Sequence, residues 1–375
     1  MTFSILGRFK IALILTLVFS CDNKNSDIPI QFSKEQFATL VEILSENGGN
    51  FDSDNLVSNE AGYLHISSFL KKFAVKNEVY IGVGPDQNFT YISQLKPRYA
   101  FILDIRRDNL IEHLIYKAIF DLSETRALFL SLLFSKPLSD GLLDKANPSI
   151  IELVEYFDKT QNNEDLYKTN LKKITDKIST YGISLKDRDY SRIANFYQQF
   201  FQKNLNLKWE YRSDGDRGIP FITYRSFLLG KDLEGNLGNF LNSNEDYWFI
   251  RDMQARNAII PIIGDFAGEH ALQAIGQYVR KRGDLVSVFY LSNVEYYLYP
   301  DKKFDQFARN LRSLPINGQS LIIRAFVNLR NQEHPKQKSQ HLMTTLIQYV
   351  RSFNQLYAEG TYQSYYDLGT KNYIH

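Results

Sequence analysis

Five short apolar runs constrain the fold of this chain more than any other feature of its sequence. Each run is rich in Ile, Val, Phe and Tyr and shows almost no alternation between polar and apolar residues. The runs cover residues 78–82, 99–103, 258–263, 285–291 and 320–327. Such runs are typical of strands that are buried on both faces, as in a parallel sheet. We therefore expect a buried, mostly parallel sheet.

Segments with helical spacing of apolar residues separate these runs. Three of them lie next to predicted strands, at residues 88–95, 267–282 and 303–313. Strands that alternate with helices favour a doubly wound sheet with helices on both faces. The predicted fold class is accordingly α/β, with a doubly wound, mostly parallel sheet.

A long helical stretch interrupts this alternation between the second and third runs. It starts with Leu110, Ile111, Leu114 and Ile115, whose spacing is that of an amphipathic helix. Further helices are expected at residues 148–159, 165–181 and 190–205. We expect residues 109–244 to form a helical insertion that caps the core. The core then comprises residues 76–108 and 245–375.

Residues 31–75, which precede the first predicted strand, are predicted to form an N-terminal helical lid. Helices are expected at residues 33–45, where Ser33 can cap the N-terminus, and at residues 60–73. The polar loop between them is expected to cover the site, with Asn59 and Glu60 facing inward.

The first 20 residues have the pattern of a bacterial export signal. Arg8 and Lys10 precede the apolar residues 11–19, a stretch too short to span a bilayer, which requires roughly 20 residues. The residues up to Cys21 resemble a lipobox, in which the cysteine receives a lipid. Cys21 is the single cysteine of the sequence. We expect residues 1–20 to be removed and Cys21 to be lipidated.

Residues 21–30 are mostly polar and are expected to tether the folded part to the lipid. The lipoprotein interpretation predicts a protein of the cell envelope, outside the cytoplasm, with a membrane as its partner. An ordinary signal peptide, or a short anchor that ends in a cysteine, is the alternative interpretation.

Charge and motif composition exclude several classes of function. Without Arg8 and Lys10 the chain carries 42 basic and 42 acidic residues. A formally neutral chain has no electrostatic footprint for nucleic acid. The six histidines form no metal-binding spacing, so no metal site is predicted. Neither a nucleophile elbow nor a P-loop motif is present.

The turn after the first predicted strand is a candidate binding element. Gly82 and Gly84 permit a tight turn and a close approach of the backbone to a ligand. Asp86 can cap the helix that follows. In an open parallel sheet, ligands bind at the carboxyl ends of the strands, close to the point where the strand order reverses. The glycines could also serve the turn alone.

Polar residues follow the next three predicted strands in the same way. Asp104 follows the second strand, Asp265 the third, and Asn293 with Glu295 the fourth. An acid about 20 residues beyond the glycine turn can accept hydrogen bonds from ribose hydroxyls. The alternatives are structural, because Asp104 could pair with Arg106 or Arg107 and Asp265 could cap a helix.

Four fragments in this order support a family resemblance: VGPDQNF, DIRRDN, GDFAG and YLSNVE. Together they resemble a family of uncharacterised bacterial proteins with a Rossmann core like that of class I S-adenosylmethionine-dependent methyltransferases. The resemblance covers residues 78–108 and 248–328. It implies S-adenosylmethionine as cofactor. The residues that it assigns to cofactor binding are Gly82, Gly84, Asp86, Asp104, Asp265 and Asn293.

The resemblance also implies individual roles. Gly82 and Gly84 would flank the methionine part of the cofactor, Asp104 would bind the ribose, and Asp265 would lie beside the adenine amino group. Asn293 would stand where such enzymes keep polar groups that face the substrate. Glu295 would stand there too, and it is our candidate for the catalytic acid or base.

Two functions follow as expectations. The first is methyl transfer from S-adenosylmethionine to an unknown small-molecule or lipid-borne acceptor. The second is a non-catalytic cell-envelope lipoprotein that uses the core to bind a ligand or a protein. Tyr80 stands where these methyltransferases carry an acid, and the cofactor is made in the cytoplasm; both facts favour the second. A dinucleotide or nucleotide-sugar enzyme is a third, which the negative charge of Asp86 at the helix start disfavours.

Overall fold

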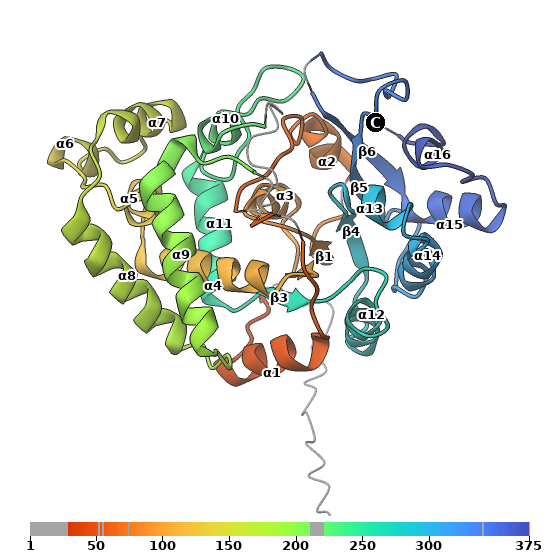
Figure 1. Cartoon of the computed structure of the whole chain (residues 1–375), viewed down its shortest axis with the longest axis horizontal. Helices are drawn as coiled ribbons and strands as arrows, with labels where there is room; N and C mark the ends of the chain where they lie inside the picture. The colour runs from red at the N-terminus through yellow and green to blue at the C-terminus, as the bar shows by residue number, and fades with distance from the viewer. Residues whose placement is uncertain are drawn as a thin grey trace, which may run out of the picture.

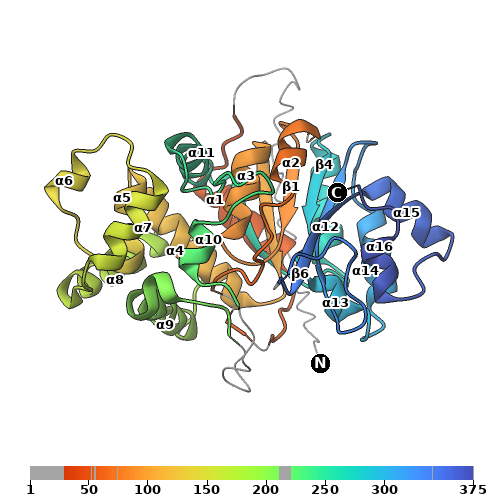
Figure 2. The ribbon, with the colours of Figure 1, turned by 90° about the horizontal axis from the view of Figure 1, so that it is seen from above.

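A six-stranded sheet runs through the middle of the protein and separates two groups of helices (Figure 1 and Figure 2). The computed structural model describes residues 29–51, 53–54, 56–73, 75–210, 221–339 and 341–374. The strands are β1 (Val79–Gly82), β2 (Tyr99–Asp104), β3 (Ile259–Ile263), β4 (Val286–Tyr290), β5 (Leu321–Val327) and β6 (Met343–Tyr349).

The strands lie in the order β3-β2-β1-β4-β5-β6. Strands β1 to β5 pair in parallel, and β6 pairs antiparallel to β5. The protein is therefore a mixed α/β structure with a mostly parallel sheet, as predicted. The strand order reverses between β1 and β4, which is where a doubly wound sheet offers a binding crevice.

All five predicted runs form strands, and the side chains of these strands are buried from end to end apart from the half-buried Val327. The proline in β3, Pro261, is tolerated because β3 is an edge strand and pairs only with β2. The sequence analysis missed β6, whose Thr344, Thr345 and Gln348 are buried polar residues in a hairpin partner of β5.

Helices cover both faces of the sheet, as Figure 2 shows. One layer consists of α3 (Gln87–Leu95), α4 (Arg107–Leu122) and α11 (Asn244–Ala255). The other layer consists of α12 (Ala271–Lys281), α14 (Phe304–Arg312) and α15 (Val350–Ala358). The short helices α13 (Val294–Leu298) and α16 (Tyr365–Thr370) belong to the same side.

The long connection between β2 and β3 is helical. Beyond α4 it comprises α5 (Arg126–Phe134), α6 (Asp140–Leu143), α7 (Ile150–Lys159), α8 (Glu164–Ser179), α9 (Asp187–Lys203), the 3-10 turn η1 (Asn204–Asn206) and α10 (Tyr224–Leu228). These helices gather at the end of the molecule opposite α15 (Figure 1). Helix α4, which was predicted to start the cap, packs on α8 and α9 of the cap and also on β3 and β2. It therefore serves the sheet as a crossover helix.

The N-terminal segment begins with α1 (Lys34–Leu44), which Ser33 caps in a reciprocal capping box with Gln36. Of the helix predicted at residues 60–73, only α2 (Ser67–Phe73) is helical, and residues 61–66 form turns. The predicted signal, Cys21 and most of the tether lie outside the described residues. Within the described part of the chain, no helix is long and apolar enough to cross a membrane.

Candidate functional site

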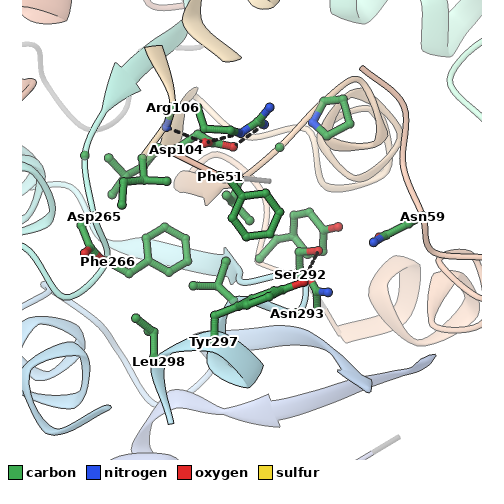
Figure 3. Close-up of a pocket in the computed structure, with 18 of the residues that line it drawn as sticks. Phe51, Asn59, Asp104, Arg106, Asp265, Phe266, Ser292, Asn293, Tyr297 and Leu298 are labelled. Atoms are coloured by element: carbon green, nitrogen blue, oxygen red, sulfur yellow. Dashed lines mark hydrogen bonds and ion pairs between the residues drawn. The ribbon is translucent and has the colours of Figure 1, made fainter. Parts of the chain in front are cut away.

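A pocket of about 290 Å³ opens at the carboxyl ends of β1, β2, β3 and β4 (Figure 3). This is the edge of the sheet at which the strand order reverses. Parallel strands bring their carboxyl ends to one edge, so residues that are distant in the sequence meet there. The volume lies just below the range for small-molecule sites, about 300 to 1,000 Å³.

Four of the predicted binding residues line this pocket. They are Gly84, Asp104, Asp265 and Asn293, one from the end of each of the four strands. Gly84 has a φ of +80°, and a Cβ atom built on it would meet nothing within 4 Å. Its backbone is thus left-handed and open toward the pocket, as a turn that approaches a ligand requires.

Aromatic and aliphatic side chains form the rest of the wall. Phe51 and Tyr297 meet edge to face over the pocket, with ring centroids 5.0 Å apart and an angle of 85°. Phe266 and Leu298 lie on the side of Asp265 (Figure 3). The N-terminal segment contributes Phe51, as well as Val57, Ser58 and Asn59, to the lining. The predicted inward position of Asn59 is thus confirmed.

Asp104 is held by Arg106. Its Oδ1 accepts hydrogen bonds from the Arg106 backbone N–H at 2.8 Å and from Nε at 3.1 Å, and its Oδ2 accepts one from Nη2 at 2.9 Å. Both side chains are buried. A carboxylate offers about four acceptor positions, so one position on Oδ2 is left for a ligand. The structural pairing with Arg106 and a role toward a ligand are therefore compatible.

Asp265 also has partners from the protein. Its Oδ1 accepts a hydrogen bond from the Ala267 backbone N–H at 2.9 Å, and Lys303 Nζ lies 3.2 Å from Oδ2. Lys303 lines the pocket as well. The hydrogen bond from Ala267 resembles the helix cap that the sequence analysis gave as the alternative role of Asp265. It holds the carboxylate at the rim of the pocket.

The three other predicted residues do not line the pocket. A Cβ atom on Gly82 would lie 2.0 Å from Asn88 Oδ1, so this glycine makes room for packing under the turn. The Asp86 carboxylate is buried on the far side of the turn, where its Oδ2 accepts a hydrogen bond from the Tyr224 hydroxyl at 2.8 Å.

Glu295, the predicted catalytic residue, faces away from the pocket. It forms a buried ion pair with Arg324 of β5, with 2.8 Å between Glu295 Oε2 and Arg324 Nε. The pocket is lined by Val294, Tyr297 and Leu298 of the same helix, and the helical spacing of these three residues leaves Glu295 on another face. Glu295 therefore cannot contact a ligand in this pocket directly.

The carboxylate of Glu60, in the loop of the predicted N-terminal lid, is buried behind the residues that line the pocket. Glu60 Oε1 accepts hydrogen bonds from Tyr290 at 2.6 Å and from Ser292 at 2.5 Å, and Oε2 accepts one from Gln87 at 3.1 Å. Tyr290 and Ser292 line the pocket. Burial raises the pKa of Glu60 despite these hydrogen bonds. Sequence analysis expected Glu60 to face inward, but the polar loop gave no indication of its partners.

The described residues contain no group of three or more His, Cys, Asp or Glu side chains that could hold a metal ion. The carboxylates of Asp104 and Asp265 are paired with cations, and that of Glu60 with hydroxyls. Its polar groups suit an organic ligand that offers hydrogen-bond donors to Asp104 and Asp265 and apolar surface to the aromatic wall.

A comparison with protein families found a match that covers most of the chain. A family model described as "Domain of unknown function (DUF7790)" matches residues 55–371. The match includes all six strands, the helical connection and most of the pocket, but not the wall residue Phe51. No curated protein matches the chain.

Proposed function

The chain belongs to the family described as domain of unknown function (DUF7790), and we propose that its pocket binds S-adenosylmethionine in a methyltransferase-like Rossmann core. The observation that carries the proposal is the convergence of Gly84, Asp104, Asp265 and Asn293 on one pocket from four adjacent parallel strands. The family resemblance assigns six residues to that ligand, and these four of them line the pocket.

The topology supports the same proposal. The strand order β3-β2-β1-β4-β5, with the reversal between β1 and β4, resembles the core of class I methyltransferases. The antiparallel strand β6 at the edge is compatible with that core. The pocket lies at the reversal, which is where nucleotide-containing ligands bind in open α/β sheets.

The residues present fit this cofactor. Asp104 would accept a ribose hydroxyl on its remaining acceptor position, and Asp265 would accept the adenine amino group. Phe266 and Leu298 would provide apolar surface for the adenine, while Gly84 would border the methionine part. When it is bound, S-adenosylmethionine supplies an activated methyl group.

The chain's own residues suggest a route for the proton that a methyl acceptor would release. The Ser292 hydroxyl lines the pocket and donates to Glu60. Burial raises the pKa of Glu60, which makes it a stronger base than an exposed glutamate. We assign proton acceptance to Glu60 through Ser292, and Glu295 no longer has a catalytic role in the proposal.

A second candidate function is a non-catalytic lipoprotein that binds a ligand or a protein in the cell envelope. It is favoured by the ion pair that removes Glu295 from the pocket and by the predicted export signal. S-adenosylmethionine is made in the cytoplasm, so an exported chain would encounter little of it. Incubation with radiolabelled S-adenosylmethionine and an envelope extract separates the two, because methyl transfer is expected only from an active enzyme.

The binding test is calorimetric titration of the detergent-solubilised full chain with S-adenosylmethionine and its demethylated product. We expect saturable binding to the wild type. Asp265→Asn removes the charge but keeps the turn to Ala267. It should weaken binding by about ten- to 150-fold, since a hydrogen bond to a charged group contributes about 1.5–3 kcal/mol. The matched control is Asp252→Asn on the exposed side of α11. Absence of binding to the wild type would refute the proposal.

The membrane anchor is tested separately. We propose that Cys21 carries the lipid and that residues 1–20 are removed. Metabolic labelling with a clickable fatty acid should mark the wild type and leave Cys21→Ser unmarked. Labelling of the variant, or a wild-type protein found in the cytoplasm without lipid, would contradict the anchor and strengthen the cytoplasmic enzyme interpretation.

A further inference from the structure

The described chain enters the fold at the edge of the sheet opposite the pocket. The parallel strands begin at this edge, which we call the amino edge, and the helices that precede them end there. Arg256, at the end of α11, donates to the Ile30 carbonyl, and the Asn257 amide donates to the Phe32 carbonyl at 2.8 Å. Phe32 also packs edge to face on Tyr99, the first residue of β2. The start of the described chain is therefore fixed at the amino edge, beside α11 (Figure 2).

Helix α11 lies along the amino edge. In its first turn, Glu245 forms an ion pair with Lys96 at the end of α3, and its other end leads directly into the edge strand β3. The outward side of the helix exposes Trp248, whose accessible fraction is 54%. Trp248 Nε1 donates to the carbonyl oxygen of Glu124, just beyond the end of α4, at 3.4 Å. The indole thus lies over the ends of two helices and remains open to the surroundings.

Exposed apolar side chains occur at other helix ends of the same edge. Leu122, the last residue of α4, is 38% exposed and lies two residues before the carbonyl that Trp248 contacts. Phe73, the last residue of α2, is 43% exposed and stacks on Phe69 with ring centroids 4.4 Å apart. Tryptophan and phenylalanine side chains with one face open are typical of surfaces that rest on a membrane interface.

The amino edge also carries exposed positive charge. Lys72 ends α2, Lys76 follows it, and Arg280 and Lys281 belong to the last turn of α12. Among the described residues, no acid forms an ion pair with any of these four. Basic residues at helix ends complement the helix dipole, but that role does not require apolar side chains beside them. Several acids of this edge are already paired with other basic residues, as in Lys96–Glu245, Arg98–Asp284 and Arg256–Asp252.

The predicted lipid anchor would keep this edge close to a membrane. Fully extended, the chain from Cys21 to Pro29, the first described residue, spans at most about 28 Å. Helix α11, which starts from the point where that chain enters the fold, is about 18 Å long. A lipid on Cys21 would therefore hold Trp248 and the basic helix ends within reach of the bilayer surface.

We propose that the amino edge is a membrane-binding face: its lysines and arginines contact anionic lipid headgroups, and Trp248 and Phe73 enter the interfacial layer. The proposal rests on the lipid anchor proposed above. Lysine and arginine side chains are attracted to anionic leaflets, and aromatic side chains are enriched at the level of the headgroups. The charge and the exposed side chains of the amino edge therefore complement the same surface.

This orientation determines where the pocket of the protein obtains its ligand. The pocket opens at the carboxyl ends of the strands, and β2 and β3 separate that edge from the amino edge by about 15–20 Å. With the amino edge on the membrane, the pocket faces the aqueous side. Its ligand, or the acceptor of a methyl group, is then a water-soluble molecule rather than a lipid.

The two tryptophans of the chain make the proposal testable by fluorescence, because Trp209 is buried and Trp248 is exposed. The full chain is reconstituted into vesicles of phosphatidylcholine and phosphatidylglycerol, with brominated acyl chains as the quencher. Trp248→Phe gives the background signal of Trp209. We expect brominated lipid to quench Trp248 and acrylamide to quench it less than in vesicles of phosphatidylcholine alone.

Two matched controls test the orientation and the charge. Tyr190→Trp, made in Trp248→Phe, places an exposed indole on α9 next to Asp189, which pairs with Arg107 at the start of α4; acrylamide should quench it and brominated lipid should not. Each lysine close to an anionic surface strengthens binding about fivefold. Removal of three should therefore shift the anchored protein about 100-fold toward the undocked state. The charge variant is Lys72→Gln, Lys76→Gln and Lys281→Gln, and its control is Lys168→Gln, Lys172→Gln and Lys173→Gln on α8.

Vesicle-bound protein whose Trp248 is not quenched by brominated lipid would overturn the proposal and leave the anchor intact. Equal quenching at position 190, or quenching of Trp248 that the three-lysine variant leaves unchanged, would overturn it as well. So would an indole that is shielded from acrylamide in native envelopes but not in protein-free vesicles, since a protein would then cover this face. The anchor itself is read from the labelling of Cys21, and a chain that does not bind vesicles at all would overturn both proposals.

Discussion

The acids that line the pocket and the acids buried behind the Gly84 turn differ in whether a cation is bonded to them. In the pocket, Asp104 is paired with Arg106 and Asp265 with Lys303. Behind the turn, Asp86 and Glu112 have no cation bonded to them among the described residues. The acids of the pocket are therefore paired with cations, whereas burial raises the pKa of both Asp86 and Glu112. Both regions contain buried acids, so the difference between them lies in the pairing of their charged groups.

The largest expected effect is on the pocket side, in Arg106→Ala. The substitution leaves the buried Asp104 carboxylate without its cation, and loss of one partner of a buried pair costs about 3–5 kcal/mol. Chemical denaturation should show a loss of that order at pH 7. A loss below about 1 kcal/mol would mean that solvent screens the pair. The pocket acids would then not differ from the acids behind the turn in the way described above.

The two glycines of the turn should differ in the same experiment. Gly82→Ala places a methyl group against Asn88 Oδ1 and Tyr80 in a tightly packed interior, for which overpacking costs about 1–3 kcal/mol. Gly84→Ala meets no atom within 4 Å and should cost only the strain of its positive φ, about 1–2 kcal/mol. Gly84→Ala should in addition weaken ligand binding, and an unchanged affinity would argue against a ligand at that turn.

The buried carboxyl group of Asp86 should affect the pH dependence of stability. The pKa of Asp86 is raised from 3.8 to about 7 in the folded protein, so the folded state holds a proton that the unfolded state has lost. Stability should therefore fall as the pH rises from about 4 to about 7 and level off above. Asp86→Asn should flatten this fall. Denaturation midpoints across that window that decline equally in the variant would remove Asp86 as a cause.

The smallest effect is expected at the rim of the pocket. Lys303 is half exposed, and exposed ion pairs contribute about 0–1 kcal/mol, so Lys303→Ala should hardly change the free energy of unfolding. Its effect should appear in ligand affinity instead, because the Asp265 carboxylate loses its nearest cation. A large loss of stability would show that the rim is a structural element.

The sequence predicted those parts of the fold that depend on local pattern. Uninterrupted apolar runs identified β1 to β5, and the position of a polar residue at a strand end identified Asp104 and Asp265 as neighbours. Strand β6 was not predicted, because its buried Thr and Gln residues interrupt the apolar pattern of its sequence. Its Gln348 is satisfied by Arg324, a partner that no local pattern reveals.

The sequence was least informative where the direction of a side chain decides its role. Glu295 and Tyr297 are two residues apart, yet only Tyr297 faces the pocket, because the residue at which α13 begins sets the phase of the helix. The side-chain partners of Glu60 come from α3 and from β4 and its end, more than 25 residues further along the chain. The burial of the polar residues Asn109, Glu112 and His113 of α4 was not predicted either, because the helix was recognised from its apolar face alone.

The most direct test of the central claim is a crystal structure of the protein soaked with S-adenosylmethionine. We predict density in the pocket at the ends of β1 to β4, with the ribose at Asp104, the adenine amino group at Asp265 and the methionine part at Gly84. A pocket without density at millimolar ligand, in crystals that leave it open to solvent, would contradict the account, as would a ligand bound elsewhere on the chain.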